Sequence, residues 1–145
     1  MNNWILVIGA IFGALAVATG AFGAHALQNV LDERAQGWYD TAVTYHARHA
    51  LALVACGLAA LLASSMSNAA GSQRLFASSA VCFAIGITLF SGSLYVMAFT
   101  GVTRLGIITP FGGALLIAGW LLLAFSVAKL RTCLLYTSPS PRDRG

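Results

Sequence analysis

Four stretches of the chain contain no Asp, Glu, Lys or Arg, and each is long enough to cross a membrane. They cover residues 1–31, 49–73, 75–103 and 105–128. A helix needs about 20 apolar residues to span the hydrocarbon core of a bilayer. With polar connections removed and helix-start signals included, the pattern predicts spans over about 4–24, 41–64, 75–99 and 110–128. We therefore expect an all-α membrane protein, a bundle of four transmembrane helices.

Composition supports this class and argues against a soluble one. Of the 145 residues, 59% are hydrophobic and only 8% are charged, too few charges for a water-exposed surface. The net charge of +4 is spread over connections and the C-terminal tail, and no basic run could follow phosphates. We expect the lipid bilayer, and no nucleic acid, as a partner. Cys56 and Cys82 lie within predicted spans without the spacing of a metal finger.

Helix-start signals and small residues mark the predicted spans. Asp40 is placed to cap the second helix, and Thr109 followed by Pro110 is typical of a helix start. In the first span Gly9 and Gly13 form a GxxxG pattern that Ala16 and Gly20 continue. Small residues at this spacing let a second helix approach closely. We expect helices to pack through these glycine-rich faces, and other copies of the chain or other membrane proteins are among the candidate partners.

The two ends of the chain need separate interpretation. A cleavable signal peptide is the alternative for the first span, but "MNNW" carries no Lys or Arg and the apolar run is long. From residue 132 onward the character changes to "TCLLYTSPSPRDRG", which resembles translated adaptor sequence or a disordered tail. The side of both termini carries Arg74, Lys129 and Arg131, and the opposite side carries Arg34, Arg104 and, if counted, Arg48. The positive-inside rule decides little between the two sides without the tail, and we favour cytoplasmic termini.

Several motifs together resemble a known family. They are "GAFGAHAL" (20–27), "TAVTYHARHALALVACG" (41–57), "LFSGSLYVMAFTG" (89–101) and "ITPFGGALLIAGW" (108–120). In this order they are similar to the domain of unknown function 423 family, the YgdD-like proteins, which are related to the transmembrane protein 256 family. The resemblance implies a multi-pass protein of the bacterial inner membrane. It implies no established activity, so no catalytic residue or cofactor can be carried over.

A small set of polar residues within or beside the spans could serve a function: His25, Tyr45, His46, Arg48, His49, Ser91, Ser93 and Tyr95. The three histidines could share a metal ion or haem. A solute path could instead be lined by Arg48, His49, Ser91, Ser93 and Tyr95. The structural alternative is an interfacial helix start, with Arg48 reaching headgroups or pairing with Asp40. The predicted start at residue 41 favours it, because it leaves the cluster within about 13 Å of the helix end.

The sequence thus favours a structural or accessory membrane protein. A small transporter or channel and a haem- or metal-binding protein remain the alternatives. No Ser-His-Asp arrangement or pair of buried carboxylates is recognisable, so we expect neither an enzyme nor a cofactor.

Overall fold

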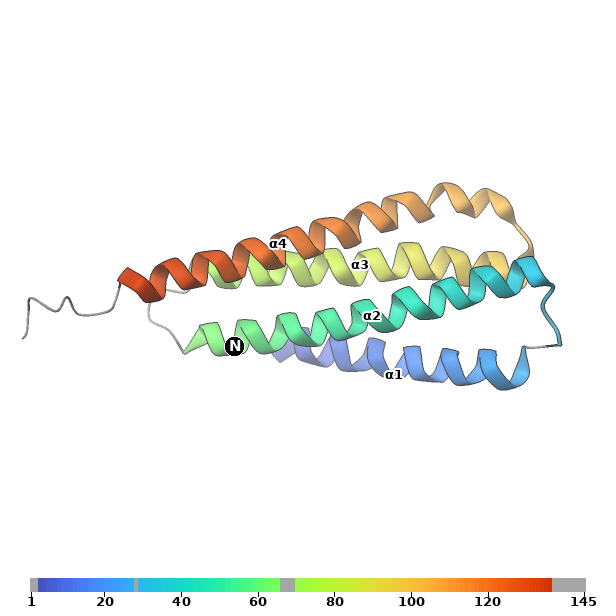
Figure 1. Ribbon diagram of the computed structural model, residues 1–145, viewed down its shortest axis with the longest axis horizontal. Coiled ribbons are helices and arrows are strands. Elements are labelled where there is room, and N and C mark those ends of the chain that lie inside the picture. Colours follow the sequence, from blue (N-terminus) through green and yellow to red (C-terminus); the bar gives the residue numbers. More distant parts are fainter. Residues whose placement is uncertain (1–2, 28, 66–69, 137–145) are drawn as a thin grey trace, which may run out of the picture.

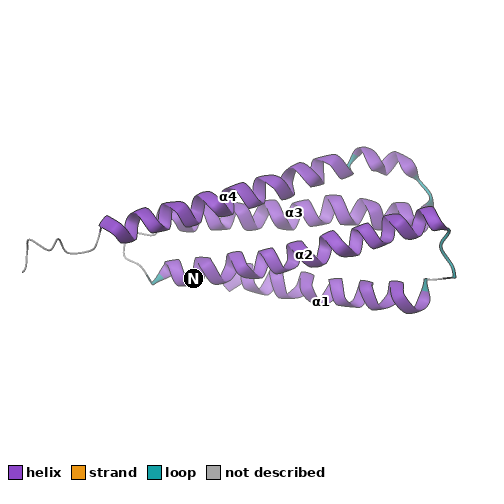
Figure 2. Cartoon of the chain, in the orientation of Figure 1, coloured by secondary structure: helices purple, strands orange, loops and turns teal. Residues whose placement is uncertain are grey.

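The computed structural model describes the backbone of residues 3–27, 29–65 and 70–136, and the side chains of all these except residues 70 and 131–136. It contains α1 (Asn3–Ala26), α2 (Glu33–Ser64), α3 (Ala70–Thr100), the short 3-10 helix η1 (Thr103–Ile107) and α4 (Thr109–Tyr136) (Figure 1). Figure 2 shows that the described part is helical and free of strands. Among the described residues, four helices are long and apolar enough to cross a membrane, which confirms the predicted fold class.

The helices pack in chain order. α2 lies against α1 and α3, and α3 lies against α2 and α4, whereas the described residues of α1 and α4 do not touch (Figure 1). The buried core accordingly follows the interfaces of neighbouring helices, with Leu53, Phe76 and Phe83 at its centre. The helices thus form an open arrangement in which α1 and α4 are the two outer helices.

Glycines bring the helix backbones together. A Cβ atom added to Gly9 would lie 3.0 Å from the backbone nitrogen of Val54, and one added to Gly112 would collide with the backbone of Phe90. These glycines therefore permit close contact of α1 with α2 and of α3 with α4. The predicted small-residue face is correct at Gly9, but Gly13 has no atom of another helix within 4 Å of such a Cβ. Close packing through Gly9 and Gly112 thus serves contacts within the chain.

α2 begins eight residues before the predicted start. Asp32 is its N-cap, and the Asp32 carboxylate accepts a hydrogen bond of 2.7 Å from the backbone N–H of Ala35. The predicted cap at Asp40 is wrong, since Asp40 lies inside the helix and accepts a hydrogen bond from Gln36. The first turns are helical because one face, including Ala35 and Tyr39, is buried while their charged residues face outward.

α4 also starts differently from the prediction. Thr109 is its first residue, and the carbonyl of Ile108 accepts the hydrogen bond from the backbone N–H of Gly112. The Thr109 hydroxyl instead lies 2.8 Å from the Ser93 hydroxyl of α3. At its other end α4 continues to Tyr136, so the first residues of the predicted tail are helical, and residues 137–145 lie outside the described part.

Candidate functional site

A hydrogen-bonded group joins α1, α2 and α3. The Tyr95 hydroxyl lies 3.1 Å from the Thr19 hydroxyl and 3.3 Å from Nδ1 of His46. Close by, the Tyr39 hydroxyl donates a 2.7 Å hydrogen bond to the backbone carbonyl of Thr19. Side chains from three helices therefore meet at Thr19, and polar bonds of this kind hold membrane helices together.

The Thr19 hydroxyl also donates to the backbone carbonyl of Leu15, at 3.0 Å. The direction of the bond between Tyr95 and His46 depends on which ring nitrogen of His46 carries the proton. With the proton on Nδ1, the Tyr95 oxygen accepts from His46; with the proton on Nε2, the Tyr95 hydroxyl donates to Nδ1. The Nε2 atom is buried without a hydrogen-bond partner among the described residues.

His49 faces a different interface from His46. Its Nδ1–H donates a 2.7 Å hydrogen bond to the backbone carbonyl of Tyr45, and its ring lies 5.9 Å from the Phe83 ring of α3 and 6.2 Å from the Trp120 ring of α4. The His46 ring instead makes an edge contact with Phe12 of α1 at 5.6 Å. The two histidines are thus neighbours in sequence but belong to separate contacts.

The structure does not bring the three histidines into one metal site. His25 is exposed in the last turn of α1, six residues beyond Thr19 or about 9 Å along the helix. Within the described ranges, no group of three or more His, Cys, Asp or Glu residues is arranged to hold a metal ion. The three histidines that the sequence suggested as shared ligands, His25, His46 and His49, are thus not gathered into one such group in the described part of the chain.

The two serines of the "SGS" motif differ in their bonding. Ser93 is within hydrogen-bonding distance of the Thr109 hydroxyl and donates to the Phe90 carbonyl, so it helps join α3 to α4. Ser91 is 1% exposed, and its hydroxyl has no partner in the described part of the chain. A second bond between α3 and α4, from the Ser79 hydroxyl to the Gly119 carbonyl at 2.8 Å, was missed by the sequence analysis. Only the small size of both residues could have indicated it.

Arg48 lies in the middle of its helix and points outward. It is 15 residues after Glu33 and 16 before Ser64, or about 22 Å and 24 Å from the two ends at 1.5 Å per residue. Its side chain is exposed and has no hydrogen bond or ion pair to the described residues. Arg48 therefore lies farther from the start of its helix than the predicted distance of about 13 Å, because α2 starts earlier than expected. Of the two options considered for its side chain, pairing with Asp40 is not observed.

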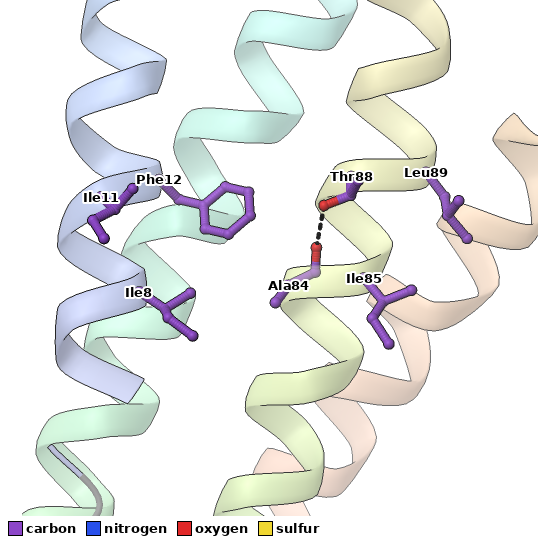
Figure 3. A pocket seen from close by; sticks show the side chains of 7 residues that line it. All are labelled: Ile8, Ile11, Phe12, Ala84, Ile85, Thr88 and Leu89. Atoms are coloured by element: carbon purple, nitrogen blue, oxygen red, sulfur yellow. Dashed lines mark hydrogen bonds between the residues drawn. The ribbon is translucent and has the colours of Figure 1, made fainter. Parts of the chain in front are cut away.

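An apolar cavity opens between α1 and α3. It has a volume of about 360 Å³ and is lined by the seven side chains labelled in Figure 3: Ile8, Ile11, Phe12, Ala84, Ile85, Thr88 and Leu89. Its one hydroxyl, that of Thr88, donates to the Ala84 carbonyl (Figure 3). A surface of this chemistry suits hydrocarbon chains. None of the candidate residues named from the sequence lines it.

Four long apolar helices, tied together by polar bonds across their interfaces, define a small multi-pass helical membrane protein. The chain belongs to the family described as "Protein of unknown function (DUF423)", whose pattern matches residues 19–113. This confirms the resemblance seen in the sequence motifs.

Several relatives match nearly the whole chain. The chain is 39% identical to a UPF0382 membrane protein of Staphylococcus saprophyticus, over 86% of this chain and 97% of the relative. It is 41% identical to the UPF0382 membrane protein YwdK of Bacillus subtilis, over 86% and 95%. It is 36% identical to the UPF0382 inner membrane protein YgdD of Escherichia coli, over 90% and 93%. No solved structure matches. The relatives and the four apolar helices make this a multi-pass protein of the cell membrane.

Proposed function

We propose that the protein is a structural or accessory component of the inner membrane, which positions other membrane components and neither catalyses a reaction nor moves a solute. The observation that carries this proposal is how its interior polar groups are bonded. The hydroxyls of Tyr39 and Ser79 donate to backbone carbonyls of neighbouring helices, and so does the thiol of Cys56. The Ser93 side chain bonds to the Thr109 hydroxyl of α4, and the Tyr95 side chain bonds to the Thr19 hydroxyl of α1.

Bonds of this kind favour a static role. A solute path needs polar groups that can exchange protein partners for the solute, whereas a hydroxyl bonded to a backbone carbonyl in a dry interface stabilises helix association. The residues considered for a path also face different ways. Arg48 points outward, while His49 packs against Phe83 and Trp120.

Flux through reconstituted protein tests the proposal. The full chain is placed in sealed vesicles that contain a pH-sensitive dye, and the decay of an imposed pH gradient is followed. Solute uptake is measured in parallel with potassium, chloride and small amino acids as probes. We expect rates equal to those of empty vesicles. A protein-dependent rate that Tyr95→Phe abolishes would contradict the static role.

One observation favours a second candidate, a proton path. Nε2 of His46 and the Ser91 hydroxyl are both buried without partners among the described residues, and unpaired buried polar groups are costly. On this alternative the pH gradient would decay faster with protein present, and both His46→Ala and Ser91→Ala would return the rate to that of empty vesicles. Thr88→Val is a matched control, because Thr88 is exposed and bonded within its own helix.

A further inference from the structure

The depth of Arg48 can be read from the packing as well as from helix length. Gly9 of α1 lies against Val54, and Gly20 lies against Val43. Arg48 is six residues before Val54, so in this antiparallel pair it lies opposite residue 15, near the centre of α1 (Asn3–Ala26). An arginine side chain reaches roughly 6–7 Å, whereas half the hydrocarbon thickness is about 15 Å. Arg48 therefore cannot place its whole charge among the headgroups.

Arg48 is part of an outward-facing strip that runs along α2. We define the α2 seam as Thr41, Arg48, Leu51, Ala55, Leu58 and Leu62, all of which are exposed. Leu51 and Leu62 are each 71% exposed. Successive members are three, four or seven residues apart, which is the spacing by which one helix packs along another. The shape of the seam thus suits a helix that runs alongside α2.

The charge on the seam limits what that helix can be. Charged side chains at mid-depth in a membrane almost always pair with another polar or charged group. Asp32, Glu33 and Asp40 all lie near the start of α2, and Asp40 is eight residues from Arg48, or about 12 Å along the helix. The fourth acidic residue, Asp143, lies beyond α4 in the tail.

A second copy of the chain therefore does not complement Arg48. In a parallel copy, Asp32, Glu33 and Asp40 lie at the same remote level. In an antiparallel copy, these carboxylates lie toward the opposite face of the membrane. Either arrangement brings a second arginine to the middle of the bilayer, and like charges there repel.

We infer that the α2 seam docks a transmembrane helix of a different protein, and that this helix carries an Asp or Glu at mid-depth whose carboxylate pairs with Arg48. The planar guanidinium suits this role, because it binds a carboxylate through two parallel N–H···O bonds. The inference rests on the proposed accessory role and specifies the chemistry of the partner.

The test uses a synthetic single-span helix as the probe. A polyleucine host peptide with one central Glu is mixed with the labelled full chain in lipid vesicles, and association is measured by energy transfer. Peptides with central Gln or Leu are compared at the same density. We expect the Glu peptide to bind about tenfold more tightly than the Gln peptide, since charge-assisted hydrogen bonds are the stronger class.

Variants of the chain locate the contact. Arg48→Gln should remove the preference for the Glu peptide, and Arg48→Lys should weaken it, because lysine keeps the charge but not the forked geometry. Arg48→Glu should reverse it, so that a peptide with a central Lys binds best. Arg34→Gln is the matched control on the same helix. Arg34 lies at the helix start, 5.0 Å from the centre of the Trp38 ring, and its loss should change nothing.

Three outcomes would overturn the inference: equal binding of the Glu, Gln and Leu peptides, an Arg48→Gln variant that keeps the preference, or self-association of the chain that depends on Arg48. Circular dichroism verifies that each variant folds. If Arg48→Gln does not fold, Arg48→Lys alone tests the inference. If the peptide-binding test fails and no solute flux is measured, only the proposed partner chemistry is rejected. Protein-dependent flux would instead reject the accessory role itself.

Discussion

Replacing Arg48 by leucine should make α2 enter a membrane more readily. Arg48 lies 15 residues after the start of a 32-residue helix and faces outward without a partner among the described residues. On the insertion scale an arginine at the helix centre costs about 2.5–3.5 kcal/mol, whereas a leucine contributes about −0.3 to −0.6 kcal/mol. The difference predicts that Arg48→Leu lowers the apparent insertion free energy of α2 by roughly 3–4 kcal/mol.

A translocation assay measures this quantity. The segment 33–64 is placed in a host protein between two glycosylation sites, and the ratio of singly to doubly glycosylated product gives the insertion free energy. Arg34→Leu is the matched control, because Arg34 is the second residue of the helix and a charge near the membrane surface costs little. A change of less than about 1 kcal/mol for Arg48→Leu, or one equal to that of Arg34→Leu, would show that Arg48 lies near the interface and would refute the argument from depth.

The remaining predictions concern packing and topology. Tyr95→Phe removes the hydroxyl that links Thr19 to His46 and should lower the free energy of unfolding in bilayers by about 1–3 kcal/mol. The control Tyr45→Phe changes a tyrosine that is 38% exposed and should alter this free energy by less than about 0.5 kcal/mol. Equal effects of the two substitutions would mean that the link contributes nothing. Gly112→Ala should destabilise the protein by roughly 1–3 kcal/mol, because the added methyl meets the Phe90 backbone. Gly113→Ala, whose added Cβ would lie 3.6 Å from the Phe90 ring, should be tolerated, and thermal unfolding in detergent compares the two. Reporter fusions at the two ends should report the same compartment, since four helices span the membrane, and opposite compartments would exclude four spans.

The number and approximate places of the spans were predictable because they depend on composition. A bilayer accepts long apolar helices and excludes charges wherever their faces point, so the charge-free stretches were sufficient. The first span was predicted over 4–24 and is observed as Asn3–Ala26. The start of α2 was not predictable in this way. Its first turns carry charges that read as a connection, and only the packing of Ala35 and Tyr39 shows that they are helical.

The candidate site depended on tertiary structure to a much greater degree. The sequence indicated Tyr95 and His46 as candidates, and the fold brings them together. The fold also adds Thr19 to the group, a residue that no sequence pattern distinguishes within an apolar helix. It also separates His25 from the other histidines. The sequence alone determined that Arg48 lies in a membrane helix. That its side chain faces outward was decided by α1 and α3, because they cover the other sides of α2 and leave the face with Arg48 open.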